Sequence, residues 1–234
     1  MRYNHVKLDI GVPKLIRLDE NGTRRYVTPE GKKYPSITTV LSAYNRKEIM
    51  EWRQRVGNEE ANRVSGKASM RGTKLHKACE DYINNKEPVF KTPFEADLFQ
   101  RFKPVLHRIN NVYAQELQLY SDHLRIAGTV DCIAEFDGKL SVIDFKTSTK
   151  EKEKNHILNY FMQCSGYAIM FEERFNIPIN RTVVAIALED GEPQVFIEKR
   201  DTYVESLVQY RNIYESNARY KSSRATAIRA TSSL

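Results

Sequence analysis

The sequence predicts an α/β fold, a mixed central β-sheet flanked by helices with a helical N-terminal extension, and three observations lead to it. Asn-Gly or Asp-Gly pairs, which favour two-residue hairpin turns, separate strand-like runs at 21–22, 137–138 and 190–191. Between these runs, apolar residues recur at helical spacing. The 234 residues show no linker or internal repeat, and they suffice for one well-buried core but are short for two.

Turn pairs, capping residues and spacing indicate the individual elements. Hairpins are expected across about 15–27, 124–147 and 182–199, with one more strand over 116–121. Ser36 is the expected cap of a short helix through residue 41, and Thr92 opens a helix toward Ile109 that is kinked at Pro104. The remaining helices are expected over 46–56, 59–70, 73–83, 155–175 and 202–220.

These elements divide the chain into two parts and a tail. We expect one domain over residues 1–220, in which 1–72 hold the first hairpin and an arginine-rich helical extension and 73–220 form the core. Beyond Tyr220 the chain is rich in Ser, Ala and Arg, so 221–234 are expected to form a mobile basic tail.

Composition excludes several classes of protein. Hydrophobic residues make up 41% and aromatics 10% of the chain, which is typical of a globular protein. No apolar run approaches the roughly 20 residues of a membrane span, and no secretory signal precedes the first strand. Three scattered cysteines (79, 132 and 164) predict neither disulfides nor a zinc or iron–sulfur site. A reducing cytoplasm is therefore expected, that of a host if the gene is a phage's.

Charge is distributed unevenly along the chain. The net charge is +7, with 16 Lys/Arg against 8 Asp/Glu in residues 1–75 and 17 against 22 in residues 76–216. A basic front beside an acidic middle suggests a polyanionic partner, although many basic proteins bind none.

The hairpin over 124–147 brings two carboxylates together. A two-residue turn at Asp137-Gly138 places Phe136 opposite Lys139 and, further along both strands, Asp131 opposite Asp144. Like charges about 5 Å apart are unfavourable, and apolar neighbours on both faces reduce screening by water. A divalent cation such as Mg²⁺ or Mn²⁺ would relieve the repulsion, with Lys146 one side-chain step along the strand. Ordinary ion pairs, one of them with Lys146, are the alternative.

Four motifs in this order resemble the RecB-type branch of the PD-(D/E)XK nucleases, over about residues 34–175. They are Arg-Gly-Thr-Lys-Leu-His with His76, Gly-Thr-Val-Asp with Asp131, Val-Ile-Asp-Phe-Lys-Thr-Ser with Asp144 and Lys146, and Gln163-x-x-x-Tyr167. Together with the strand at Glu116 and the stretch Tyr-Pro-Ser-Ile-Thr-Thr-Val-Leu at 34–41, they look closest to the mitochondrial genome maintenance exonucleases and their phage relatives.

The resemblance implies a role for each matched residue. Asp131 and Asp144 would bind one or two Mg²⁺ ions, for which Mn²⁺ can substitute, with help from the backbone carbonyl of Phe145. Lys146 would be the catalytic lysine, and His76 would be a further metal ligand or would act near one. The substrate-binding residues would be Gln163, Tyr167, Ser36, Thr38, Trp52, Arg71 and Thr147.

Several of these residues also have plain structural explanations. His76 could be a half-buried histidine at a helix edge, and Gln163 and Tyr167, four residues apart, the polar edge of an amphipathic helix. Glu116 either holds a second metal or water, or is a surface carboxylate. Trp52, the only tryptophan, either stacks on bases or belongs to the core, and Ser36 and Thr38 bond phosphates or cap a helix.

The expected function is a Mg²⁺-dependent exonuclease acting on single-stranded DNA in phage or bacterial replication, recombination or repair. Basic residues from Arg46 to Lys74 would track the phosphates, and the helical extension, by resemblance, would arch over the site so that a free strand threads in. The rivals are a structure-selective endonuclease and a nucleic-acid-binding module without catalysis. A helicase or ATPase would have to be a partner, because no phosphate-binding Gly-x-x-x-x-Gly-Lys loop is present.

Overall fold

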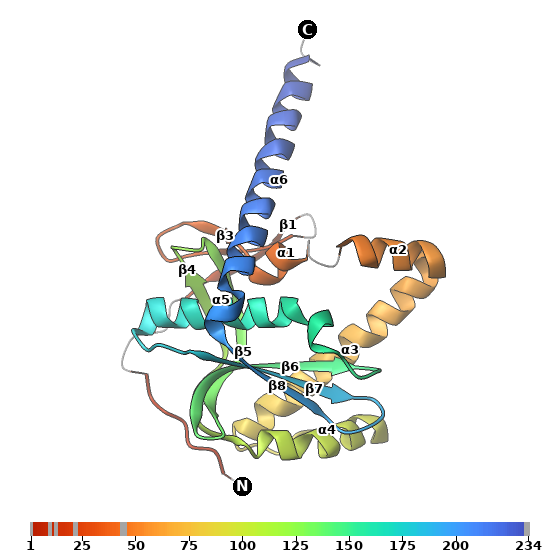
Figure 1. Cartoon of the computed structure of the whole chain (residues 1–234), viewed down its shortest axis with the longest axis vertical. Coiled ribbons are helices and arrows are strands. Elements are labelled where there is room, and N and C mark those ends of the chain that lie inside the picture. Colours follow the sequence, from red (N-terminus) through yellow and green to blue (C-terminus); the bar gives the residue numbers. More distant parts are fainter. Residues whose placement is uncertain (1, 9–10, 12–13, 21–22, 43–45, 232–234) are drawn as a thin grey trace.

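Two β-sheets form the framework of the chain (Figure 1). The computed structural model describes residues 2–8, 11, 14–20, 23–42 and 46–231, with side chains up to residue 218. The smaller sheet has the antiparallel order β1-β2-β3, with β1 Ile16–Glu20, β2 Thr23–Val27 and β3 Lys33–Pro35. The larger has the order β4-β5-β6-β7-β8, with β4 Ile109–Ser121, β5 Ile126–Phe136, β6 Lys139–Ser148, β7 Arg181–Leu188 and β8 Gln194–Lys199.

The five-stranded sheet is mixed because β6 and β7 are parallel while its other neighbours are antiparallel. A parallel connection requires a crossover, and helix α5, Leu158–Phe175, supplies it after the 3₁₀ turn η1, Lys154–His156. One face of the sheet buries apolar residues against α5, α1 (Ile37–Leu41) and α6 (Val204–Thr231). The opposite face packs on α3, Asn58–Ile83, and α4, Pro93–Leu106 (Figure 1). The predicted α/β class with a mixed, helix-flanked sheet is confirmed.

The predicted capping residues form their hydrogen bonds. Ser36 Oγ accepts from the Thr39 amide at 3.0 Å, and Thr92 Oγ1 accepts from the Glu95 amide at 3.3 Å. Helix α2, Arg46–Val56, has the predicted bounds, and α5 ends at Asn176, whose φ of 54° is left-handed. Helix α4 ends at Leu106, so Ile109 opens β4 instead of closing the helix.

Three predicted boundaries were wrong. The helices expected over 59–70 and 73–83 are one continuous helix, α3, which also crosses the division expected at residue 72. Its glycines at 66 and 72 each cost only about 1 kcal/mol relative to alanine, too little to interrupt a cooperative helix. Strand β4 begins at Ile109, seven residues before the expected start. Helix α6 follows the 3₁₀ turn η2, Arg200–Tyr203, and continues to Thr231, past the expected end at residue 220. The mobility of the tail stays a prediction.

The hairpin of β5 and β6 has the predicted turn and register. Asp137 and Gly138 both have positive φ, 50° and 71°, and the pairs run from Phe136–Lys139 to Cys132–Ile143. The loop between β7 and β8 is longer, residues 189–193, so Asp190-Gly191 is not a two-residue turn there. The turn at Asn21-Gly22 lies outside the described residues, although β1 and β2 pair as a hairpin around it.

The small sheet docks on the large one beside the end of this hairpin. Tyr26, 1% exposed, places its hydroxyl 3.2 Å from Thr129 Oγ1 on β5, and Ser36 forms an isolated bridge with Ala127. Among the helices of the described residues, none has the length and apolar character needed to cross a membrane.

Candidate active site

The site lies where β5 and β6 separate. Their ladder stops at the Cys132–Ile143 pair, and one residue further the Asp131 carboxylate accepts a hydrogen bond from the Phe145 amide at 2.9 Å. A side chain thus replaces the backbone acceptor that the neighbouring strand would have supplied. Asp131 is fixed at the edge of the ladder with its other oxygen free to face α3.

Three potential ligands converge at this edge. His76 from α3, Glu116 from β4 and Asp131 from β5 each offer one ligand atom, and these atoms lie within 4.8 Å of one another. His76 Nδ1 is 3.5 Å from Asp131 Oδ1, and Glu116 lies between the register pairs that flank Asp131. Two carboxylates and an imidazole fit a divalent cation such as Mn²⁺ or Mg²⁺. The donor set therefore supports the predicted metal ligands His76 and Asp131, and it includes Glu116, for which a role as ligand of a metal or water was one of two alternatives.

Glu116 has an unusual backbone for a strand residue. Its φ is +47°, in the left-handed region that residues with a side chain seldom adopt. Such conformations cost about 1–3 kcal/mol and are often found at functional sites. The side chain is exposed at the edge of the cluster, and its partial desolvation there, followed by the negative charge of Asp131, raises the pKa of Glu116.

Asp144 and Lys146 form a buried pair next to this cluster. Asp144 is 2% exposed; its Oδ2 pairs with Lys146 Nζ, and its Oδ1 accepts from Gln163 Nε2 at 3.2 Å. Lys146 Nζ also lies 5.1 Å from the centroid of the Tyr160 ring. The ion-pair alternative for Asp144 is thus present in the structure, while the metal cluster of described residues contains Asp131 without Asp144.

Burial and charge shift the protonation of this pair in definite directions. Burial, opposed by Lys146, raises the pKa of Asp144 to about 6, and the nearby Asp131 carboxylate adds to the rise. Burial lowers the pKa of Lys146, but the carboxylates of Asp144 and Asp131 more than compensate, so that it lies above its ordinary value. The neighbouring carboxylates therefore favour the protonated form of Lys146.

A cavity of about 390 Å³ joins the cluster, the pair and the small sheet. It is lined by Arg17, Arg24, Tyr26, Ser36, Thr38, His76, Glu116, Gly128, Thr129, Asp131, Lys146, Gln163 and Tyr167. Seven of the residues singled out in the sequence besides Glu116 are thus brought together in one hollow.

The detailed contacts qualify what some of these residues can do. Ser36 is 1% exposed and its hydroxyl caps α1, which is the structural explanation for that residue. Tyr167 is 2% exposed, and a Cβ on Gly128 would lie 2.8 Å from its ring, so Tyr167 forms part of the wall. Gln163 orients Asp144. Four of the residues expected to bind substrate line the cavity. Of these, Thr38 alone is exposed and neither caps a helix nor contacts the pair of Asp144 and Lys146.

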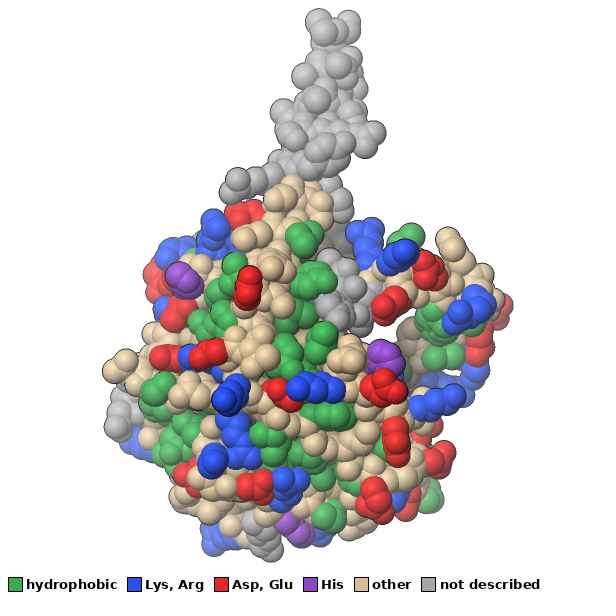
Figure 2. All heavy atoms as spheres, viewed as in Figure 1, with side chains coloured by type: hydrophobic (Ala, Val, Ile, Leu, Met, Phe, Trp, Pro, Cys, Tyr) green, Lys and Arg blue, Asp and Glu red, His purple; other side chains and the backbone are tan. Residues whose placement is uncertain are grey.

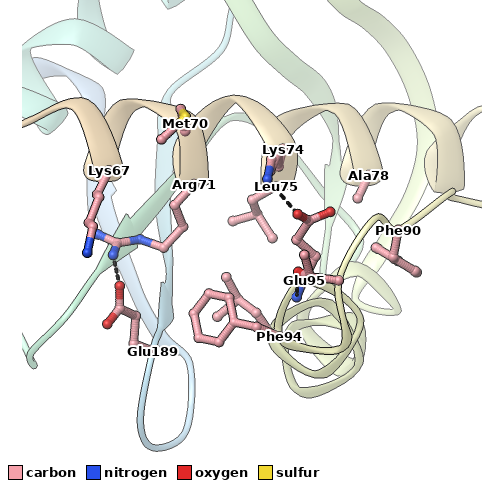
Figure 3. A pocket seen from close by; sticks show the side chains of 12 residues that line it. Lys67, Met70, Arg71, Lys74, Leu75, Ala78, Phe90, Phe94, Glu95 and Glu189 are labelled. Atoms are coloured by element: carbon pink, nitrogen blue, oxygen red, sulfur yellow. Dashed lines mark hydrogen bonds and ion pairs between the residues drawn. The ribbon is translucent and has the colours of Figure 1, made fainter.

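Three predicted substrate-binding residues lie outside this cavity. Arg71 pairs with Glu189 in a separate hollow of about 250 Å³ between α3 and α4 (Figure 3). Thr147 points to α3, with its hydroxyl 4.0 Å from where a Cβ of Gly72 would be. Trp52 is half-buried on α2 and lines none of the described hollows near the site.

Sequence reasoning missed four cavity residues, Arg17, Arg24, Tyr26 and Thr129, as well as Tyr160 beside Lys146. A signal for the first three was present. The turn at Asn21-Gly22 fixes a register in which Arg17 opposes Tyr26 and shares its face with Arg24.

Comparison with known proteins identifies a family. Residues 39–230 match the family described as the PD-(D/E)XK nuclease superfamily. The chain is 26% identical over 175 residues to mitochondrial genome maintenance exonuclease 1 of Homo sapiens and 29% identical over 178 residues to that of Xenopus tropicalis. Each alignment covers 68% of this chain and 50% of the relative, so the chain spans about half the length of these relatives. A crystal structure of a putative exonuclease from Eubacterium rectale aligns with a TM-score of 0.47 and 11% identity, over 64% of this chain and 65% of that one.

Proposed function

Because the chain belongs to the PD-(D/E)XK nuclease superfamily, we propose that it is a metal-dependent deoxyribonuclease, an exonuclease that degrades single-stranded DNA from a free end. The observation that carries this proposal is the grouping of His76, Glu116 and Asp131 in one cavity with Lys146. The relatives named as genome maintenance exonucleases support DNA as the substrate and a role in replication, recombination or repair.

Each residue of the site would have a distinct role in phosphodiester hydrolysis. His76, Glu116 and Asp131 would hold the cation, joined by Asp144 when its ion pair with Lys146 opens. A bound divalent ion supplies Lewis-acid stabilisation of the phosphate and an activated water. Lys146, being protonated, would leave Asp144 and donate to the negative charge that develops on the phosphate. Gln163 would keep Asp144 in place during this exchange, because it donates to the other carboxylate oxygen.

Digestion of end-labelled and circular single-stranded and duplex DNA, with Mg²⁺, Mn²⁺ or EDTA, tests the proposal. We expect cleavage of linear single strands that requires metal and is abolished in Asp144→Ala and Lys146→Ala. Lys150→Ala is the matched control, because Lys150 is exposed two residues beyond β6. Retained cleavage by a clean Asp144→Ala preparation would refute the proposal, and cutting of the circular strand would assign an endonuclease instead.

One observation favours a second candidate, a nucleic-acid-binding module without catalysis. Lys146 forms an ion pair with the buried Asp144 carboxylate and Gln163 donates to its Oδ1, so the charge has a partner without a metal, although Oδ2 accepts no hydrogen bond from the described residues. Titration calorimetry with Mn²⁺ distinguishes the two. A nuclease site binds the ion and loses binding in Asp131→Asn, whereas an inactive module shows no saturable heat.

A further inference from the structure

The β1–β2 hairpin directs two arginines toward the site. Arg17 is paired in register with Tyr26, and Asp19 with Arg24, so these four side chains share one face of the hairpin. Tyr26 on that face reaches Thr129, two residues before Asp131 on β5. Arg17 and Arg24 therefore lie over the candidate active site, although they are far from its residues in the sequence.

The hollow that contains the site continues on both sides. Arg17, His76 and Glu116 line both the site cavity and a neighbouring hollow of about 550 Å³ along α3. Arg24 and Thr38 line both the site cavity and a hollow of about 740 Å³ that also reaches Arg46 on α2 and Tyr214 on α6. The shared linings describe one groove, in which Arg17 lines the part next to His76 and Glu116 and Arg24 lines the part next to Thr38.

Neither Arg17 nor Arg24 forms a strong ion pair with the side chains that the structure describes. Among the side chains the structure describes, both pair with Asp19 alone, Arg17 at 3.0 Å and Arg24 at 3.7 Å, and Asp19 is 59% exposed. The Nε of Arg24 is buried and has no hydrogen-bond partner among the described residues. An exposed ion pair is weak, so a phosphate that accepts two hydrogen bonds from a guanidinium can displace Asp19.

The distribution of charge over the surface does not indicate where phosphates would bind. Figure 2 shows basic and acidic side chains interspersed over the visible face, without one uniformly basic region. Many basic residues of α2 and the first half of α3 are exposed or paired locally, as Arg63 is with Glu60. The arginines of the hairpin differ from these because they line the site cavity itself, whereas Arg46 of α2 lines only the adjoining hollow.

We propose that Arg17 and Arg24 are phosphate-binding residues that hold a single nucleic-acid strand in the groove beside His76, Glu116 and Asp131. This proposal rests on the proposed function, since it names the residues that position its substrate. It assigns the phosphate track through the site to the β1–β2 hairpin, where the sequence had suggested the basic helices over 46–74.

The test is binding of a fluorescent single-stranded oligonucleotide by anisotropy, in EDTA so that no cleavage occurs, over a series of salt concentrations. Arg17→Gln and Arg24→Gln should each weaken the affinity about tenfold and reduce the slope of log K against log salt by about 0.7. Arg55→Gln is the matched control, since Arg55 is exposed on α2 and lines none of the three hollows. Thermal melts confirm that all three variants fold.

Each outcome decides between the alternatives. If Arg55→Gln weakens binding as much as the hairpin variants do, or if the hairpin variants bind like the wild type, the assignment to Arg17 and Arg24 is refuted. Cleavage by the wild type is measured separately with Mg²⁺ and Mn²⁺. Its absence refutes the proposed function, whereas active wild type with unaffected hairpin variants refutes only the phosphate-binding role.

Discussion

Replacing Gly166 with alanine should change the free energy of unfolding in two opposite ways, through helix propensity and through packing. Gly166 lies inside α5, where alanine is favoured over glycine by about 1 kcal/mol. The added Cβ, however, would lie 2.3 Å from Ile37 Cδ1 and 3.2 Å from Leu207 Cδ2, and both of these side chains are fully buried. Overpacking of this kind costs about 1–3 kcal/mol. The net expectation is a loss of about 1–2 kcal/mol, because Ile37 is also packed against Gly128 and has little room to move.

Urea and thermal denaturation followed by circular dichroism measure this loss. A destabilisation of that size lowers the melting temperature of a chain of this length by about 2–8 °C. Gly66→Ala is the control, because Gly66 is also helical and a Cβ there meets no atom within 4 Å. It should stabilise the protein by about 1 kcal/mol.

The steric cause can be isolated with a second substitution. Ile37→Val removes the Cδ1 that the new methyl would meet, at a cost of about 0.5–1.5 kcal/mol when made alone. In the double variant the alanine methyl occupies the vacated space, so the two losses should sum to at least about 1 kcal/mol more than the measured loss. Strict additivity, or stabilisation by Gly166→Ala alone, would show that α5 is not packed as tightly against α1 as the distances indicate.

Three further changes test the site and the sheet. Lys146→Met should lower the single-turnover rate at least about 100-fold at saturating DNA, with a smaller change in DNA affinity. His76→Asn should raise the Mn²⁺ concentration for half-maximal cleavage about tenfold, and excess Mn²⁺ should recover most of the rate if His76 is a ligand. Arg101→Ala should cost about 2 kcal/mol in urea unfolding, because its guanidinium donates to the carbonyls of Leu188, Glu189 and Gly191. Asp97→Ala, which removes the exposed partner of Arg101, should cost less than about 1 kcal/mol.

Local turn chemistry made the central hairpin predictable. Asp137-Gly138 has the left-handed backbone that a two-residue turn requires, and that turn fixes which residues face each other along β5 and β6. The register as far as Cys132 and Ile143 followed without tertiary information, whereas the predicted pairing of Asp131 with Asp144 lies one step beyond the end of the ladder. The consequence that Asp131 would accept a hydrogen bond from Phe145 did not follow, because it depends on the strands separating at that point.

The ligand set could be predicted only in part. His76 and Asp131 belong to recognisable motifs, whereas Glu116 was either a ligand or a surface carboxylate, and its place in the cluster depends on the register of β4 on β5. Its positive φ is likewise set by surrounding structure, since glutamate has no intrinsic preference for it. The position of Asp144 in an ion pair with Lys146 was one of two alternatives, and periodicity cannot choose between them.

In both hairpins a two-residue turn fixes which residues face each other. For β5 and β6 this register led to the predicted site, whereas for β1 and β2 it was not used to predict one. Counting outward from Asn21-Gly22 puts Arg17 and Arg24 on the face of Tyr26, just as counting from Asp137-Gly138 gives the register of β5 and β6 as far as Cys132 and Ile143. What the sequence lacks is the docking of that face on β5 through Tyr26 and Thr129, which turns two separate arginines into neighbours of the metal cluster. The high density of basic residues predicted a phosphate-binding role for residues 46–74 instead. A helix, however, displays its charges around its whole circumference, whereas a strand places alternate residues on one side. In this chain, two arginines on a docked hairpin face are therefore stronger evidence for a phosphate contact than many on an exposed helix.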